Sequence, residues 1–116
     1  MTDWVPSVSQ VGALMPQRFG ADGPDENTIP SADQIKSVVE MKTDEVRTRC
    51  GRISETEDAE ILSFAATVVA YGAASHIEAS WWPEQPGEAA VYYRRRFEEH
   101  VEALRRQVLY HWKAHR

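Results

Sequence analysis

The stretch Ser80-Trp81-Trp82-Pro83-Glu84-Gln85-Pro86-Gly87 separates two long segments of helical pattern. Pro83 and Pro86 lack the backbone N–H that a continuing helix needs, and each disfavours helical geometry in the residue before it. One helix is therefore expected to end here and another to begin. Because two adjacent tryptophans would be costly to leave in water, we expect Trp81 and Trp82 to pack against another surface.

The segment before this break is expected to be a helix from near Glu57, after Ser54 or Thr56, to about Trp81. Its middle, residues 65–74, is apolar nearly all round, which is typical of a central, buried helix. The small residues in this stretch would let neighbouring helices approach closely. Alternatively, another subunit buries one side of it.

The segment after the break, residues 87–116, carries an apolar seam on an otherwise charged helix. The seam residues recur at spacings of four, three, four and four: Phe97, Val101, Leu104, Val108 and Trp112. At 1.5 Å per residue the seam is roughly 22 Å long. We expect the last turns of this amphipathic helix to extend beyond so small a core.

The N-terminal third is expected to contain a short helix, a long loop and a longer helix. Ser7 can cap a helix from about Val8 to Met15. Residues 16–30 are rich in glycine, proline and acidic residues and are expected to form a long loop, which either orders on a partner or is flexible. Ser31 and Gln34 form a capping-box pattern that starts a helix over residues 32–49. Gly51 is well placed to end that helix.

These elements predict an all-α fold with no convincing strand. At 116 residues the chain is expected to be a single domain, a small helical bundle of one short and three longer helices. No apolar run approaches the roughly 20 residues of a membrane span, and the first residues have no secretion signal, so we expect no membrane and a cytoplasmic chain. A single cysteine, Cys50, excludes an internal disulfide and a cysteine-based zinc site.

The charge is distributed unevenly along the chain. The net charge is −5, but residues 1–90 hold 6 Lys/Arg against 15 Asp/Glu, whereas residues 91–116 hold 7 against 3. This asymmetry indicates that the C-terminal segment has a partner of its own. The alternative is a solvated helix whose arginines serve solubility.

We find no set of residues suited to catalysis, to a metal or to a cofactor. His111 and His115 share a helix face, but no third ligand stands nearby. The acidic pairs are sequence neighbours and do not converge on one point. Arg49 and Arg52 could lower the pKa of Cys50, although a lone cysteine at a helix end is more often an incidental apolar residue. We therefore expect a protein that is not an enzyme.

The densest basic clusters are residues 94–96 and the pair Arg105 and Arg106. As a nucleic-acid stripe they are interrupted by Glu98, Glu99 and Glu102. Contact with an acidic protein surface is a better use of such a mixed-charge helix. A small helical regulatory or nucleic-acid-binding module remains the alternative function.

Four motifs in this order resemble a known family. The first two are the opening Trp4-Val5-Pro6-Ser7-Val8-Ser9-Gln10-Val11-Gly12-Ala13-Leu14 and the helix entry Thr28-Ile29-Pro30-Ser31-Ala32-Asp33-Gln34. The other two are the helix end Ile77-Glu78-Ala79-Ser80-Trp81-Trp82-Pro83-Glu84-Gln85 and the closing helix from Tyr93 through Arg96 to Arg106. Together they resemble the head–tail connector proteins (adaptor or head-completion proteins) of tailed bacteriophages, especially those that infect actinobacteria.

The resemblance implies a structural virion protein made in the host cytoplasm and located at the virion neck. Such subunits form a ring, commonly of twelve copies, beneath the portal protein of the capsid. The ring extends the DNA channel, lies close to the packaged DNA without specific binding, and docks the next tail-side connector or stopper protein.

The resemblance also suggests which residues make these contacts. The C-terminal segment of the family often engages the portal, so the candidates for that contact are Arg105, Arg106, Trp112 and Lys113. The candidates for packing between subunits are Tyr71, Trp81 and Trp82. Acidic walls would let DNA pass without binding phosphate tightly, and the loop residues Asp22, Asp25 and Glu26 are the candidates for that role. Under the alternative reading, these carboxylates confer only solubility.

Overall fold

A computed structural model describes residues 4–83 and 88–115. Within these ranges every regular element is helical, and the predicted all-α small bundle is confirmed. The elements are α1 (Val8–Ala13), α2 (Pro16–Phe19), α3 (Ala32–Cys50), the 3-10 helix η1 (Arg52–Glu55), α4 (Ala59–Trp81) and α5 (Glu88–His115). The segment Glu84–Gly87, which holds half of the predicted helix break, lies outside the described residues.

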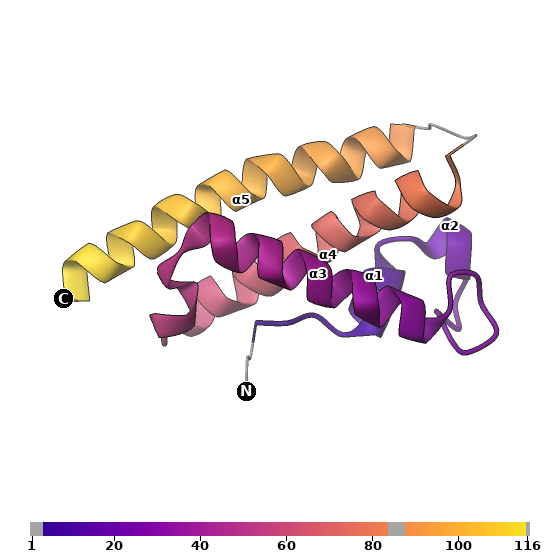
Figure 1. The fold of residues 1–116 in the computed structure, drawn as a ribbon, viewed down its shortest axis with the longest axis horizontal. Helices are drawn as coiled ribbons and strands as arrows, with labels where there is room; N and C mark the ends of the chain where they lie inside the picture. Colours follow the sequence, from indigo (N-terminus) through magenta and orange to yellow (C-terminus); the bar gives the residue numbers. More distant parts are fainter. Residues whose placement is uncertain (1–3, 84–87, 116) are drawn as a thin grey trace.

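The three long helices run antiparallel to their neighbours in sequence (Figure 1). Helix α4 contacts α3, α5 and α1, so it is the central element around which the others pack. The molecule is elongated, with extents of 46 × 27 × 21 Å. The last turns of α5 extend past the ends of α3 and α4, as the length of its seam predicts (Figure 1).

Two serines start their helices as the sequence predicts. Ser31 accepts a hydrogen bond from the Gln34 N–H at 3.3 Å, and the Ser31 N–H donates to the Gln34 side chain at 2.8 Å. The same reciprocal pair joins Ser7 and Gln10 at the start of α1. Each pair satisfies two backbone groups that a helix terminus leaves without partners.

The start of α4 differs from the prediction. Its cap is Asp58, whose carboxylate accepts hydrogen bonds from the N–H groups of Glu60 and Ile61. Thr56 instead follows η1, whose single turn occupies the connection for which no helix was predicted. Gly51 ends α3 with a φ of +66°, a conformation that favours glycine, which confirms its expected role.

The core forms where small residues of α4 meet the α5 seam. Phe97, Val101, Leu104 and Val108 are buried, which confirms the predicted seam, whereas Trp112 at its end is only partly buried. A Cβ atom added to Gly72 would lie 2.8 Å from the Phe97 ring, so glycine at this position lets the two helices approach closely.

Helix α4 is also long and apolar enough, by length and composition alone, to cross a membrane. No such helix was expected, because no apolar run in the sequence approaches the length of a membrane span. Core helices of this length meet the same criterion, and half of the most apolar stretch of α4 is buried by the surrounding elements.

The prediction of an uninterrupted loop over residues 16–30 is wrong at its start. Pro16 opens the one-turn helix α2, since proline suits the first position of a helix, and Phe19 at its end is buried. Pro24 then packs against Gly12 of α1, where a Cβ atom would lie 2.4 Å from the proline ring. The absence of a side chain at Gly12 therefore fixes where this segment crosses α1.

The rest of the segment is held by its own hydrogen bonds. The Asp25 carboxylate accepts from the N–H groups of Asn27 and Thr28, at 2.8 and 3.0 Å. The Asp25 carbonyl accepts from the Ala32 N–H at 2.8 Å, which joins the turn to the start of α3. We call residues 20–30 the acidic loop, because they hold three acidic residues and no lysine or arginine.

Candidate functional site

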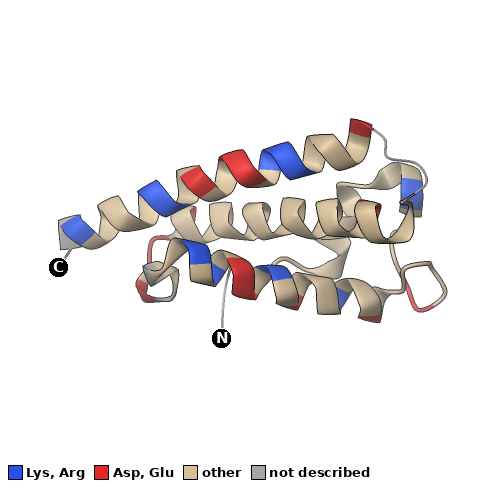
Figure 2. Cartoon of the chain, turned by 45° about the horizontal axis from the view of Figure 1, so that its top comes forward, with Lys and Arg blue, Asp and Glu red and all other residues tan. Residues whose placement is uncertain are grey.

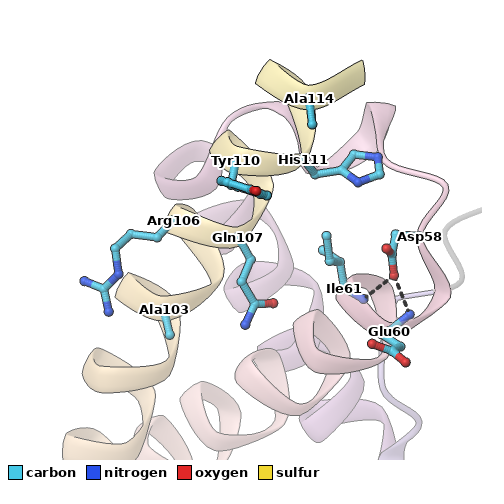
Figure 3. A pocket seen from close by; sticks show the side chains of 9 residues that line it. All are labelled: Asp58, Glu60, Ile61, Ala103, Arg106, Gln107, Tyr110, His111 and Ala114. Atoms are coloured by element: carbon cyan, nitrogen blue, oxygen red, sulfur yellow. Dashed lines mark hydrogen bonds between the residues drawn. The ribbon is translucent and has the colours of Figure 1, made fainter. Parts of the chain in front are cut away.

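A groove of about 730 Å³ lies where α4 begins and α5 ends (Figure 3). This volume is within the range of clefts that bury a ligand or several side chains of a partner. We call it the α4–α5 groove. It is lined by Asp58, Glu60, Ile61, Ala103, Arg106, Gln107, Tyr110, His111 and Ala114.

The α4 wall of this groove carries negative charge. One Asp58 oxygen accepts from two backbone N–H groups of the first turn of α4, so this carboxylate is directed at the helix terminus (Figure 3). Glu60 is exposed on the same wall. Ile61, which is 8% exposed, forms the apolar floor between the two walls.

The α5 wall combines two alanines with the polar side chains of Gln107 and His111 and has a basic outer edge. Ala103 and Ala114 leave room in front of the helix, and the Tyr110 side chain, 77% exposed, stands above it. Arg106 is exposed and extends from the outer edge of this wall, away from α4 (Figure 3). The charged side chains of the lining are therefore two carboxylates, on Asp58 and Glu60, and one arginine that points away from α4, so the groove does not favour an acidic occupant.

The four residues predicted to contact the portal do not form one cluster. Arg106 lines the groove, whereas Arg105 pairs with Glu102 on its own helix at 3.4 Å, with both side chains about half exposed. Trp112 is partly buried and Lys113 is exposed. Trp112 and Lys113 follow the last buried seam residue, Val108, whereas Arg105 and Arg106 lie between the buried Leu104 and Val108 on the outer side of α5.

A polar junction at the other end of the molecule was not foreseen from the sequence. The Arg18 guanidinium donates to both oxygens of Glu78, at 2.9 and 2.8 Å, and Glu78 is 2% exposed. The same guanidinium lies 4.2 Å from the ring centroid of Trp82. The Tyr93 hydroxyl donates to the Leu14 carbonyl nearby. The Arg18 contacts join α2 to the end of α4, and the Tyr93 contact joins the end of α1 to the start of α5.

The residues predicted to pack between subunits already have contacts within the chain. Trp81 and Trp82 are partly buried against the core, and Arg18 covers one face of Trp82. Tyr71 lies in an aromatic group with Tyr92, Tyr93 and His100, at centroid distances of 5.8 to 6.4 Å. The expected packing of the tryptophans is therefore met, at least in part, inside the chain.

The acidic loop residues have two different roles. Asp25 organises the turn through its carboxylate, as described above. Asp22 and Glu26 are exposed, and so is Ile29, with 76% of its side chain accessible. An isoleucine this exposed beside three carboxylates was not predicted as a functional residue, and only its position at the loop surface reveals it.

Burial decides the chemistry of Cys50. Its thiol donates to the Val101 carbonyl at an S···O distance of 3.8 Å. Burial raises the pKa of this thiol to about 11, although the positive charges of Arg49 and Arg105 act in the opposite direction. Arg49 lowers this pKa as its position in the sequence suggested, but desolvation of the thiolate is the larger effect, and the burial agrees with the reading of Cys50 as an incidental apolar residue.

The basic cluster at residues 94–96 lies on the exposed side of α5. Arg94 and Arg95 are exposed, and Arg96 donates to the Tyr92 hydroxyl at 3.2 Å. One turn later Glu98 pairs with Arg49 of α3 at 2.9 Å. Figure 2 shows the resulting alternation of basic and acidic bands along α5.

No group of three or more His, Cys, Asp or Glu that could hold a metal ion occurs among residues 4–83 and 88–115. Comparisons with known protein families, with curated proteins and with solved structures found no match to this chain.

Proposed function

We propose that this protein is a structural subunit of the head–tail connector of a tailed bacteriophage. In this role it forms a ring beneath the portal, extends the DNA channel and docks a tail-side protein, and it performs no catalysis. The resemblance of its four motifs to connector proteins is the starting point. The all-α bundle with an extended final helix is compatible with that role.

The observation that carries the proposal is the exposed end of α5. Beyond the buried Val108, Leu109 is 45% exposed and Tyr110 is 77% exposed, although both are large apolar side chains. Arg105, Arg106 and Lys113 add positive charge around them. Aromatic and arginine side chains together are enriched at protein–protein contacts, so this end is suited to a protein partner.

Native mass spectrometry of the chain mixed with the portal protein of the same genome tests the proposal. We expect a portal-bound ring with a fixed number of copies. A chain that remains monomeric and does not bind the portal would overturn the proposal.

The contribution of α5 is tested with variants of its last turns. Removal of Trp112 and all later residues spares the buried Val108, and we expect this truncation to abolish portal binding. Lys113→Glu and Arg105→Glu should weaken the same binding, because both replace a positive charge with a negative one. Lys36→Glu, at an exposed position on α3, is the matched control. Full portal binding by the truncated chain would exclude the residues from Trp112 onward as the contact.

The exposed side chains of Arg94 and Arg95 favour nucleic-acid binding as the second candidate function. Under that alternative, affinity for duplex DNA would fall steeply with salt, with log K decreasing by about 0.9 per phosphate contact for each tenfold increase in salt. Arg94→Ala together with Arg95→Ala would then reduce both the affinity and its salt dependence. Under the connector proposal this double variant still joins the ring.

A further inference from the structure

The face of α5 that is turned away from the core carries charges without partners. Its exposed residues, which we call the outer stripe, are Tyr92, Arg95, Glu99, Arg106, Tyr110 and Lys113. In the part of the chain that the structure describes, none of the four charged residues of the outer stripe forms an ion pair. The outer stripe is therefore available to a partner.

The outer stripe is complementary to a second, reversed copy of itself. Its residues follow one another at spacings of three, four, seven, four and three, which read the same in both directions. Two antiparallel stripes can therefore align residue by residue. In this alignment Glu99 faces Arg106, so that opposite charges meet. Arg95 faces Tyr110 and Lys113 faces Tyr92, and each of these pairs places a cation beside an aromatic ring.

Other alignments of two such helices are less favourable. A parallel alignment in the same register places every charged residue of the outer stripe against the same residue of the other copy, and like charges repel. The order of basic, acidic and basic bands along α5 therefore selects the antiparallel alignment (Figure 2). Glu102 lies near the middle of that alignment, but its charge is already paired with Arg105 of its own helix at 3.4 Å.

The middle and the ends of the outer stripe suit a close contact between two helices. Ala103 lies at the middle, and its small side chain lets another helix approach. Near one end Tyr110 is 77% exposed, so it has apolar surface to bury. At the other end the Tyr92 hydroxyl accepts a hydrogen bond from Arg96 at 3.2 Å, which holds its ring in place before a partner binds. From Tyr92 to Lys113 the stripe is about 32 Å long.

We propose that two copies of this chain pair through the outer stripes of their α5 helices, antiparallel and about a two-fold axis beside Ala103. The same surface of both copies takes part, so each of the three pairs of residues occurs twice. The pairing itself does not depend on the connector role. Its consequence for assembly rests on the proposed function: Arg106 and Lys113 belong to the proposed portal contact, so the paired copies have to separate before the portal binds.

Two single variants test the pairing. Glu99→Arg and Arg106→Glu each bring like charges together at two places in the dimer. We expect each variant to raise the dissociation constant of the dimer by about tenfold or more, measured by sedimentation equilibrium. Both positions are exposed, so both variants should fold, which circular dichroism and thermal melting verify. Glu40→Arg and Lys36→Glu make the same charge changes at exposed positions of α3 and are the matched controls, which should pair like the wild type.

A mixture of the two variants tests the two-fold symmetry of the contact. The introduced arginine of one variant faces the introduced glutamate of the other, and the unchanged Arg106 of the first faces the unchanged Glu99 of the second. One copy of each should therefore form a closed 1:1 dimer. A chain with both substitutions should pair with itself again, because both ion pairs are restored with their partners exchanged. Oligomers larger than a dimer in the mixture would show a head-to-tail contact and overturn the two-fold arrangement.

The outcomes separate this inference from the proposed function. A wild-type chain that is monomeric at every concentration but joins a portal-bound ring would overturn the pairing and leave the connector proposal standing. Unchanged dissociation constants in both single variants would overturn the outer stripe as the contact. A wild-type dimer that both single variants weaken, without any portal binding, would support the pairing and overturn the connector role. When the chain does bind the portal, native mass spectrometry should show the dimer disappearing as the ring forms.

Discussion

Arg18 and Glu78 form a two-bond ion pair between residues 60 positions apart in the sequence. Glu78 belongs to the central helix and is almost fully buried, whereas Arg18 is 20% exposed on the one-turn helix α2. The hydrogen bond to Glu78 raises the pKa of Arg18 above its ordinary value, although partial burial acts against it. The pair therefore holds the N-terminal segment onto the end of the α4–α5 pair.

Replacement of Arg18 by alanine should destabilise the fold markedly. Glu78 would be left buried without its partner, which costs about 3 kcal/mol in the free energy of unfolding, at the lower end for buried pairs because Arg18 is partly exposed. Urea denaturation followed by circular dichroism measures this loss. Arg105→Ala, which breaks the half-exposed pair with Glu102, is the control and should cost less than about 1 kcal/mol. Equal losses in the two variants would contradict the structural role of the buried pair.

Introduction of a methyl group at Gly72 should push α4 and α5 apart. The new Cβ atom would lie 2.8 Å from two atoms of the Phe97 ring, so either the ring or a helix has to move. Overpacking of this kind costs about 1 to 3 kcal/mol, more than the gain in helix propensity from glycine to alanine. Thermal melting measures the change. Thr67→Ala on an exposed position of the same helix is the control and should be neutral or slightly stabilising. An unchanged melting temperature for Gly72→Ala would contradict this prediction, because it would show that α4 and α5 accommodate the methyl group without strain.

Protonation of His76 should destabilise the protein as the pH falls. Burial, and then the charge of Lys42, lower the pKa of His76 below its ordinary value of 6.5, while Glu45 acts in the opposite direction. The unfolded chain therefore binds a proton at a higher pH than the folded chain does. Stability from this group is present above the unfolded pKa of 6.5 and is lost as the pH falls below it toward the lower folded pKa. Melting temperatures of wild type and His76→Gln across this range measure the effect, and the variant should show the weaker pH dependence. Identical pH profiles would exclude His76 as the source.

Cys50 should be inert in the folded protein. Its buried thiol, with a pKa of about 11, is almost entirely protonated near pH 8, and the thiolate is the reactive form. A colorimetric thiol reagent should therefore react slowly with the native chain and at once in denaturant. Rapid reaction of the native chain would indicate local opening between α3 and α5.

Local sequence patterns predicted most of the helices. Ser31 with Gln34 marked the start of α3, and the seam from Phe97 to Val108 marked the buried face of α5, because capping and helical periodicity are local properties. The small residues of α4 likewise indicated close helix packing. These signals need only a few consecutive residues, so a single sequence is enough to read them.

Long-range pairs left no such signal. Glu78 appears in the sequence as one acidic residue near the end of an apolar helix, and nothing local indicates that Arg18 would neutralise it. Pro16 and the residues after it had the composition of a loop, yet Phe19 gains enough by burial to stabilise one helical turn. The α4–α5 groove depends on the antiparallel packing of two helices. The exposure of Ile29 depends on the path of a turn. Neither could be predicted without the three-dimensional structure.

Because Arg18 lies against the ring of Trp82, the fluorescence of this tryptophan can report on the junction. The chain has four tryptophans, and Trp82 is in contact with a guanidinium group 4.2 Å from its ring centroid. In a chain that retains only this indole, with phenylalanine at the other three positions, its fluorescence would report detachment of α2 separately from the ellipticity of the long helices. Opening of one end and unfolding of the whole could then be followed as two different signals in one sample.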